Sequence, residues 1–250
     1  MNFFENVTLK ITKDFLYFYN SKNGRTIKKP NTLTLKQIRE QFKKINYTKF
    51  YLGEGGRSHQ HEDLEYKIKL PPFCFVFYYL LIIYERIPTP QEFVEKYIEL
   101  AFDEYKEKYC LKERYIENKD DEIKYFTYKQ ILGRVCRAYN AFNREIDLML
   151  QLSQEVDIEF LYDFQKDYKD GIDITVTYDN RTKTIGCYQA TDRGEYLFKR
   201  KHTVRRKTQV DIEFPLTPEN TMVIGDIWLY SDASVRELIE EKIKGEDKNE

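Results

Sequence analysis

Two short runs in the second half of the chain constrain the fold more than any other feature. Residues 171–178 (GIDITVTY) alternate apolar and polar side chains, and residues 184–190 (TIGCYQA) are again apolar and rich in strand-forming types. Asp179 and Asn180 lie between them and are residues typical of a tight turn. The pattern predicts an antiparallel β-hairpin.

Strand-like alternation also occurs elsewhere in the sequence. Residues 3–19 alternate and are followed by a turn at residues 21–24, which predicts one or two N-terminal strands. Residues 157–162 predict a strand before the hairpin, and residues 221–230 (TMVIGDIWLY) predict a single strand after it.

Helical spacing dominates the region between these strands. Apolar residues at intervals of three and four predict amphipathic helices over residues 34–45, 91–110 and 128–152. A last helix is predicted over residues 234–244. Residues 73–84 are apolar on every side and predict a buried helix. Thr89 and Pro90 are suited to the N-cap and first position of the helix that follows. These two helices form an ordinary helical hairpin or, alternatively, a helix-turn-helix.

Together these elements predict an α/β protein. A mostly helical N-terminal region over residues 1–115 precedes an α/β domain over residues 116–250, with a charged linker near residues 113–122. The longest apolar run, residues 72–84, is too short to span a bilayer. No N-terminal secretory pattern is present, so we expect a cytoplasmic protein.

The charge of the chain is balanced overall but uneven locally. The formal net charge is -1, which gives no general attraction to nucleic acid. Between residues 193 and 207, however, seven basic residues stand against Glu195 alone, a local charge of +6. Such a segment is suited to phosphate contacts, although a solvated basic turn is the alternative. The seven are Arg193, Lys199, Arg200, Lys201, Arg205, Arg206 and Lys207.

The predicted hairpin also carries polar residues that could hold a cation. Asp173 lies at the start of the first strand and Gln189 on the second, about 16 positions later, so the hairpin brings them face to face. Cleavage of a phosphodiester with Mg²⁺ needs clustered oxygen ligands and a cationic group beside the phosphate.

Here the chain resembles the PD-(D/E)XK nuclease superfamily, which has the restriction-endonuclease-like fold. The resemblance covers residues 128–230 and matches Glu145 on an Arg-rich helix, Asp173 in the first strand and Gln189 in the second. It implies that Glu145 and Asp173 bind Mg²⁺ (or Mn²⁺) and that Gln189 completes the catalytic site. Glu159 or Asp157 could replace Glu145.

One position departs from the superfamily's pattern. The Lys expected two residues after Gln189 is Thr191, and Lys199 or Lys201 on the following helix could take its catalytic place. We therefore expect a metal-dependent endonuclease that cleaves DNA, in restriction, phage defence or a mobile element. The alternatives are a catalytically inactive nuclease-fold protein that binds DNA, or a protein-interaction factor of a phage or its host. A homodimer or a protein partner stays open.

Other candidate ligands give weaker signals. The four cysteines lie far apart and have no zinc-binding spacing, so they are expected to be free thiols. His59 and His61 lie in a glycine-rich loop over residues 51–63, which is interpreted as a surface loop.

Overall fold

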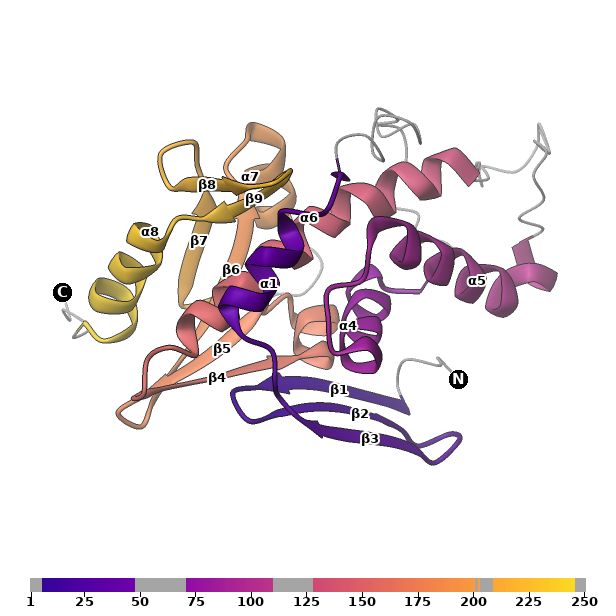
Figure 1. The fold of residues 1–250 in the computed structure, drawn as a ribbon, viewed down its shortest axis with the longest axis horizontal. Coiled ribbons are helices and arrows are strands. Elements are labelled where there is room, and N and C mark those ends of the chain that lie inside the picture. The colour runs from indigo at the N-terminus through magenta and orange to yellow at the C-terminus, as the bar shows by residue number, and fades with distance from the viewer. Residues whose placement is uncertain (1–5, 48–70, 110–127, 201, 203–208, 246–250) are drawn as a thin grey trace. The chain divides into compact units, whose positions relative to one another are not determined.

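The computed structural model describes residues 6–47, 71–109, 128–200, 202 and 209–245 (Figure 1). The chain divides into two compact units, one formed by residues 1–43 and 143–250 and the other by residues 44–142. This division differs from the boundary at residue 115 that the sequence suggests. The reason is strand pairing, because the N-terminal strand β1 (Val7–Thr12) pairs with β4 (Ile158–Asp163).

The first unit is built on a mixed seven-stranded sheet of order β3-β2-β1-β4-β5-β6-β7. Neighbouring strands are antiparallel except β6 and β7, which are parallel. The sheet with its helices confirms the predicted α/β class. The remaining strands are β2 (Phe15–Asn20), β3 (Arg25–Pro30), β5 (Ile174–Tyr178), β6 (Arg181–Gln189) and β7 (Ile212–Leu216).

The predicted hairpin is confirmed as β5 and β6. Asp179 and Asn180 form its turn with φ angles of 48° and 60°, a conformation that these two residue types adopt more readily than most. The structure adds two strands that the sequence analysis did not predict, β3 and β7.

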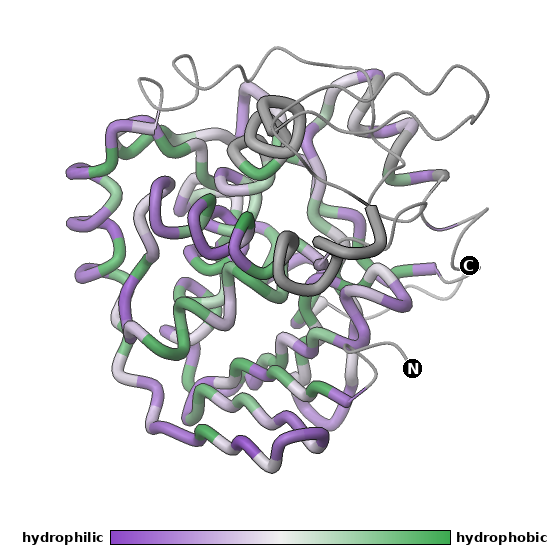
Figure 2. The backbone as a smooth tube through the Cα atoms, turned by 90° about the vertical axis from the view of Figure 1, so that its right-hand side faces the viewer, coloured by the Kyte–Doolittle hydropathy of each residue, from purple (hydrophilic) through white to green (hydrophobic). Residues whose placement is uncertain are grey.

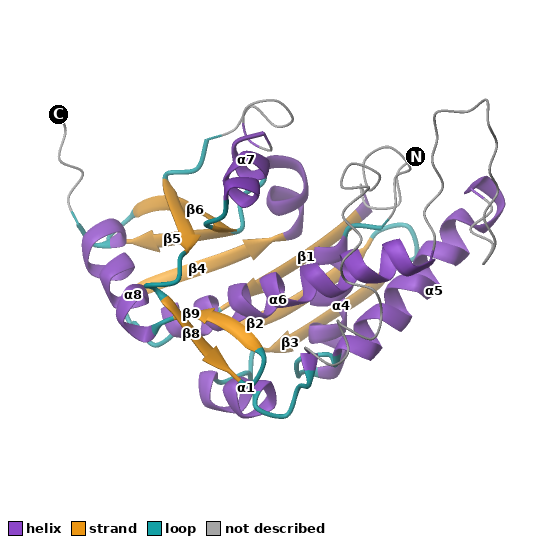
Figure 3. Ribbon diagram, turned by 90° about the horizontal axis from the view of Figure 1, so that it is seen from above, coloured by secondary structure: helices purple, strands orange, loops and turns teal. Residues whose placement is uncertain are grey.

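Apolar and polar residues alternate along the strands, as the green and purple segments of the tube in Figure 2 show. Because successive side chains of a strand point to opposite sides, the sheet has two chemically different faces. One face carries buried apolar residues such as Leu9, Ile11 and Ile185, and we call it the α6 face. The other carries Lys10, Thr175 and Gly186, which the strand register places on the same side of the sheet, and we call it the α7 face. In Figure 3, α6 (Tyr128–Leu152) and α7 (Asp192–Arg200) lie on opposite sides of β5 and β6.

Three further elements complete the first unit. Helix α1 (Leu35–Phe42) begins at a capping box of Thr34 and Gln37. Helix α8 (Asp232–Glu237) continues into the π-helix η4 (Leu238–Ile243). The run predicted as one strand over residues 221–230 is instead a hairpin of β8 (Thr221–Ile224) and β9 (Ile227–Tyr230), because Gly225 turns the chain at φ +59°.

The second unit contains α4 (Phe73–Tyr84), α5 (Pro90–Tyr109) and the first part of α6. Phe77, Phe93 and Tyr139 meet at ring-centroid distances of 5.6 to 6.0 Å and form an aromatic core. The sequence predictions of α4, α6 and the cap at Thr89 are confirmed, since the Glu92 amide donates to Thr89 Oγ1. Across the part of the chain that is described, no helix is long and apolar enough to cross a membrane.

Candidate active site around Glu145 and Asp173

Asp173 is held at the point where β5 begins. The π-helix η2 (Lys166–Asp170) ends at Gly171 with φ +78°, and this left-handed residue turns the chain into the strand. The Asp173 amide donates to the carbonyl of Ile185 at 3.1 Å, and its Oδ2 accepts from the Cys187 amide at 2.6 Å. The Asp173 carboxylate is therefore fixed against β6 through backbone groups.

Glu145 reaches the same place from α6, 28 positions earlier in the chain. It is 6% exposed and Asp173 is 5% exposed. Burial, foremost, raises the pKa of the Cys187 thiol, and the negative charges of Asp173 and Glu145 raise it further. Both negative charges therefore act on the Cys187 thiol, and the hydrogen bond from the Cys187 amide holds Asp173 beside the same residue.

Arg144 brings a positive charge to this cluster. Its side chain is 7% exposed, its guanidinium carbon lies 5.6 Å from the centroid of the Tyr230 ring, and its charge lowers the pKa of Cys187. The Arg144 Nε has no hydrogen-bond partner among the described residues. A buried donor left in this state is costly, so the group is suited to an incoming acceptor.

Tyr230 closes the cluster from β9. Its hydroxyl donates to the carbonyl of Phe214 at 2.5 Å and shares a hydrogen bond with the Cys187 thiol. Burial, foremost, raises the pKa of Tyr230, and the neighbouring Cys187 raises it further. The tyrosine therefore stays neutral and holds the sulfur in place. Sequence reasoning did not select Arg144, Cys187 or Tyr230.

The cluster fits a divalent cation only in part. Within the described ranges, no group of three or more His, Cys, Asp or Glu side chains is arranged to hold a metal ion. Mg²⁺ is often held by one or two carboxylates together with water and substrate phosphate, and Glu145 and Asp173 meet that need. Cys187 does not, because sulfur is a poor ligand for Mg²⁺.

Gln189 lies farther from Asp173 than the sequence analysis assumed. Asp173 contacts Cys187, which is two positions before Gln189 on the same face of β6. Gln189 is exposed near the end of the strand, where it pairs with Leu216 of β7. The local pairing at Asp173, rather than the count of 16 positions, decides which residue faces the carboxylate.

Lys199 is not brought to this cluster. Its neighbour Phe198 stacks on Tyr188 at 4.3 Å and fills the space beside Gly186, so α7 packs on the α7 face. Lys199 is exposed there and forms an ion pair with Glu195, which raises the pKa of the lysine. Thr191 is exposed before the helix, and its hydroxyl accepts from the Gly194 amide.

The two alternatives to Glu145 do not join the cluster. Glu159 and Asp157 pair with Lys13 and Lys244, at 4.0 and 3.3 Å, in place of joining Asp173. Some predicted residues lie outside the part of the chain whose side chains are described. They are Arg193, Arg200, Lys201, Arg205, Arg206 and Lys207, together with His59 and His61.

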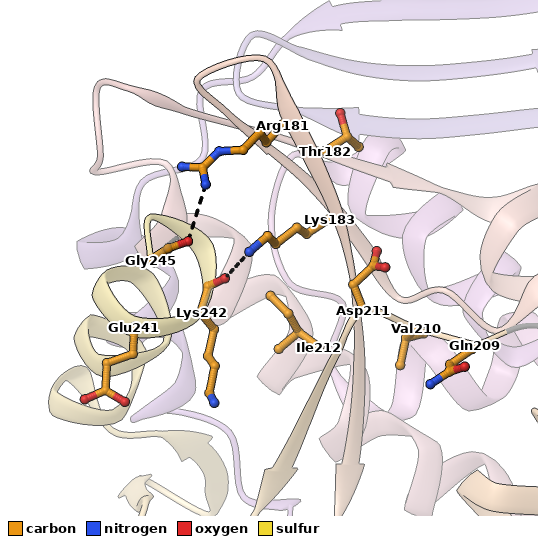
Figure 4. Close-up of a pocket in the computed structure, with 10 residues that line it drawn as sticks. All are labelled: Arg181, Thr182, Lys183, Gln209, Val210, Asp211, Ile212, Glu241, Lys242 and Gly245. Carbon is orange, nitrogen blue, oxygen red and sulfur yellow. Dashed lines mark hydrogen bonds between the residues drawn. The ribbon is translucent and has the colours of Figure 1, made fainter. Parts of the chain in front are cut away.

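A hollow with a volume of about 1530 Å³ lies beside η4, away from this cluster (Figure 4). Arg181 on its wall donates to the carbonyls of Lys244 and Gly245, and Lys183 donates to the carbonyl of Lys242. These cations satisfy carbonyls at the C-terminal end of the helix, which is a structural role.

Comparisons of the chain with protein-family models, with curated proteins and with solved structures find no match.

Proposed function

We propose that the chain is a metal-dependent nuclease that cleaves DNA, with a PD-(D/E)XK-type centre at Glu145 and Asp173. Two buried carboxylates carry the proposal: Asp173 accepts a hydrogen bond from the Cys187 amide, and the charge of Glu145 raises the pKa of the Cys187 thiol. Glu145 comes from helix α6 and Asp173 from the start of strand β5. We place this activity in the cytoplasm, in restriction, phage defence or a mobile element.

The residues of the cluster divide the work as follows. Asp173 and Glu145 would hold Mg²⁺ or Mn²⁺, which when bound supplies Lewis acidity at the phosphodiester. The Cys187 amide orients the Asp173 carboxylate by its hydrogen bond to Oδ2. Arg144 offers a guanidinium with an unused Nε–H to the phosphate. Gln189, which is exposed at the end of β6, would contact the substrate at the edge of this cluster.

Cleavage by matched variants tests this proposal. Supercoiled plasmid and single-stranded DNA are incubated with the full chain and Mg²⁺ or Mn²⁺, beside the isosteric variants Asp173→Asn and Glu145→Gln. Glu159→Gln is the control, since Glu159 is exposed and lies on the α7 face. We expect both site variants to lose at least tenfold in rate while the control keeps its rate, with folding checked by circular dichroism. Equal cleavage by all four proteins would place the activity elsewhere or in a contaminant.

A second candidate function is DNA binding without cleavage by a protein that keeps the nuclease fold. The position of Lys199 favours it, because this lysine is ion-paired on the face of the sheet opposite Glu145. In that case the parent chain does not cleave DNA, and Asp173→Asn leaves its DNA affinity unchanged. Binding then weakens steeply as salt rises, because it depends on phosphate contacts.

A further inference from the structure

The N-terminal strands present aromatic rings on an exposed surface. Phe15, Tyr17 and Tyr19 follow one another at alternate positions of β2, so all three lie on the α7 face. Phe15 is 41% exposed and the two tyrosines are half-buried, whereas Leu16 and Phe18 between them are buried on the α6 face. The three rings therefore line one strand outside the core.

Lysines flank this row directly. The strand register places Lys10 of β1 opposite Tyr17, and Lys28 of β3 opposite Tyr17 on its other side. The Lys28 ammonium also lies 4.3 Å from the centroid of the Phe15 ring. Lys10 forms an ion pair with Asp163 at 3.1 Å but keeps 40% of its side chain exposed. A lysine, a ring and a second lysine thus form a line across three strands.

The local charge of this region differs from that of the whole chain. Residues 6–30 contain six Lys or Arg and one acidic residue, Asp14, a charge of +5 in a chain of net charge -1. One of the six, Lys13, is used inside the fold, where it donates to the carbonyls of Glu155 and Ile158. Of the other five, Lys10 and Lys28 lie on the face of the three rings, whereas the register places Arg25 and Lys29 on the α6 face. Lys10 and Lys28 make the surface around the rings suited to an anionic partner.

We propose that Phe15, Tyr17 and Tyr19, with Lys10 and Lys28, form a binding platform for single-stranded nucleic acid. Bases stack on the rings, and the ammonium groups contact the phosphates between them. Stacking needs base faces that a duplex hides, so the platform prefers single strands.

The platform is independent of the proposed nuclease centre. Glu145 and Cys187 lie on the α6 face, and the three rings lie on the α7 face. Asp173→Asn is therefore expected to leave binding to the platform unchanged, even if it abolishes cleavage. Loss of one property without the other separates failure of this inference from failure of the proposed function.

Fluorescence anisotropy of a labelled oligo(dT) with the full chain tests the platform. Stacking on one aromatic ring is worth about 1–3 kcal/mol per base, so Phe15→Ala and Tyr17→Ala are each expected to weaken binding about 5- to 150-fold. Tyr17→Phe retains the ring and is expected to bind as the parent does. Tyr17→Leu retains apolar bulk without the ring and is expected to bind as weakly as Tyr17→Ala, which separates stacking from loss of folding.

A matched control comes from the second unit. Tyr84 is also 41% exposed and lies beside a cation, with the Arg86 guanidinium carbon 4.8 Å from its ring centroid. Tyr84→Ala is expected to leave binding unchanged. Lys28→Gln is expected to weaken binding and to reduce the slope of log affinity against log salt by about 0.7, the value for one phosphate contact on a single strand.

Three results with the variants and a duplex would overturn the platform. They are unchanged oligo(dT) affinity in folded Phe15→Ala and Tyr17→Ala, equal loss in Tyr84→Ala, and equal or tighter binding of a duplex of the same length. Absence of any oligonucleotide binding by the parent chain at low salt would also overturn it. In that case the aromatic row serves only the pairing of β1, β2 and β3.

Discussion

Arg39 of α1 donates two parallel hydrogen bonds to the carboxylate of Asp147 on α6. The Arg39 Nε donates to Oδ1 at 2.9 Å and Nη2 donates to Oδ2 at 3.0 Å, while Asp147 is fully buried. The same Nη2 also donates to Asp232 at 2.7 Å, and Gln151 donates to Asp147 at 2.8 Å. Because Asp147 lies two residues after Glu145, this pair fixes the part of α6 that carries the candidate site.

Arg39→Ala is expected to destabilise the protein strongly. It leaves the Asp147 carboxylate buried without its counter-ion, a change that costs about 3–5 kcal/mol. Urea denaturation followed by circular dichroism measures the change in free energy of unfolding. Lys36→Ala is the control, because Lys36 is an exposed residue of the same helix. Equal stability of the two variants would mean that the pair does not anchor α1.

The same variant has a predicted pH dependence. Burial, foremost, raises the pKa of Asp147, and Arg39 opposes this rise. Without Arg39 the pKa rises further, so the folded state takes up a proton more readily than the unfolded chain. The stability deficit of Arg39→Ala is then largest at neutral pH and shrinks as pH falls through the raised pKa. A deficit that stays constant down to about pH 4, near the ordinary value for Asp, would contradict this mechanism.

Gly225→Ala tests how the β8–β9 turn is seated. A Cβ at this position would lie 2.4 Å from the backbone oxygen of Phe42, and the residue has φ +59°. Gly24 has nearly the same angle, φ +63°, but no atom within 4 Å of an added Cβ. We expect Gly24→Ala to cost about 1 kcal/mol from backbone strain alone and Gly225→Ala to cost clearly more. Equal melting temperatures would show that the turn moves away from α1.

Elements with strong local signals could be predicted from the sequence, and elements defined by distant pairing could not. The apolar run of α4 and the periodic stripe of α6 gave correct helix ends, and Asp179-Asn180 located the hairpin turn. Strand β3 was missed because its sequence, RTIKKP, has little apolar alternation and is held only by pairing with β2. Its place at the edge of the sheet leaves it half exposed, so no hydrophobic signal marks it.

The candidate site shows the same limit. Sequence spacing selected Gln189 as the partner of Asp173, but the hydrogen bond from Cys187 to Asp173 places the carboxylate two residues earlier on β6. The residue types in the sequence do not show which backbone amide pairs with the Asp173 carboxylate. Strand alternation did carry a usable signal, since it places Cys187 and Gln189 on the face opposite Tyr188, where Phe198 of α7 packs.

Glu92→Gln tests the cap of α5. The Glu92 carboxylate accepts hydrogen bonds from Arg86 and from the Thr89 amide, and Arg86, foremost, lowers the pKa of Glu92 to about 2. Its contribution is therefore complete above the unfolded value of about 4.5 and is lost as pH falls through about 2. We expect Glu92→Gln to cost about 1 kcal/mol at pH 7 and progressively less below pH 4.5. Thermal melts at pH 7 and at a pH below 4.5 measure the loss of stability. The control variant is Glu95→Gln, one turn later in α5.

Cys187→Asp tests whether Glu145 and Asp173 can share a cation. The substitution adds a third carboxylate where burial and two negative charges already disfavour an anion, so the metal-free variant is expected to be less stable than the parent. Mg²⁺ should then restore stability, by about 2.7 kcal/mol at a concentration one hundred times its dissociation constant. Cys187→Asn has nearly the same shape without the charge and should show a much smaller response. If Mg²⁺ leaves the melting temperature of Cys187→Asp unchanged, the three side chains do not converge on one cation, and the second candidate function, binding without cleavage, becomes the better account of this site.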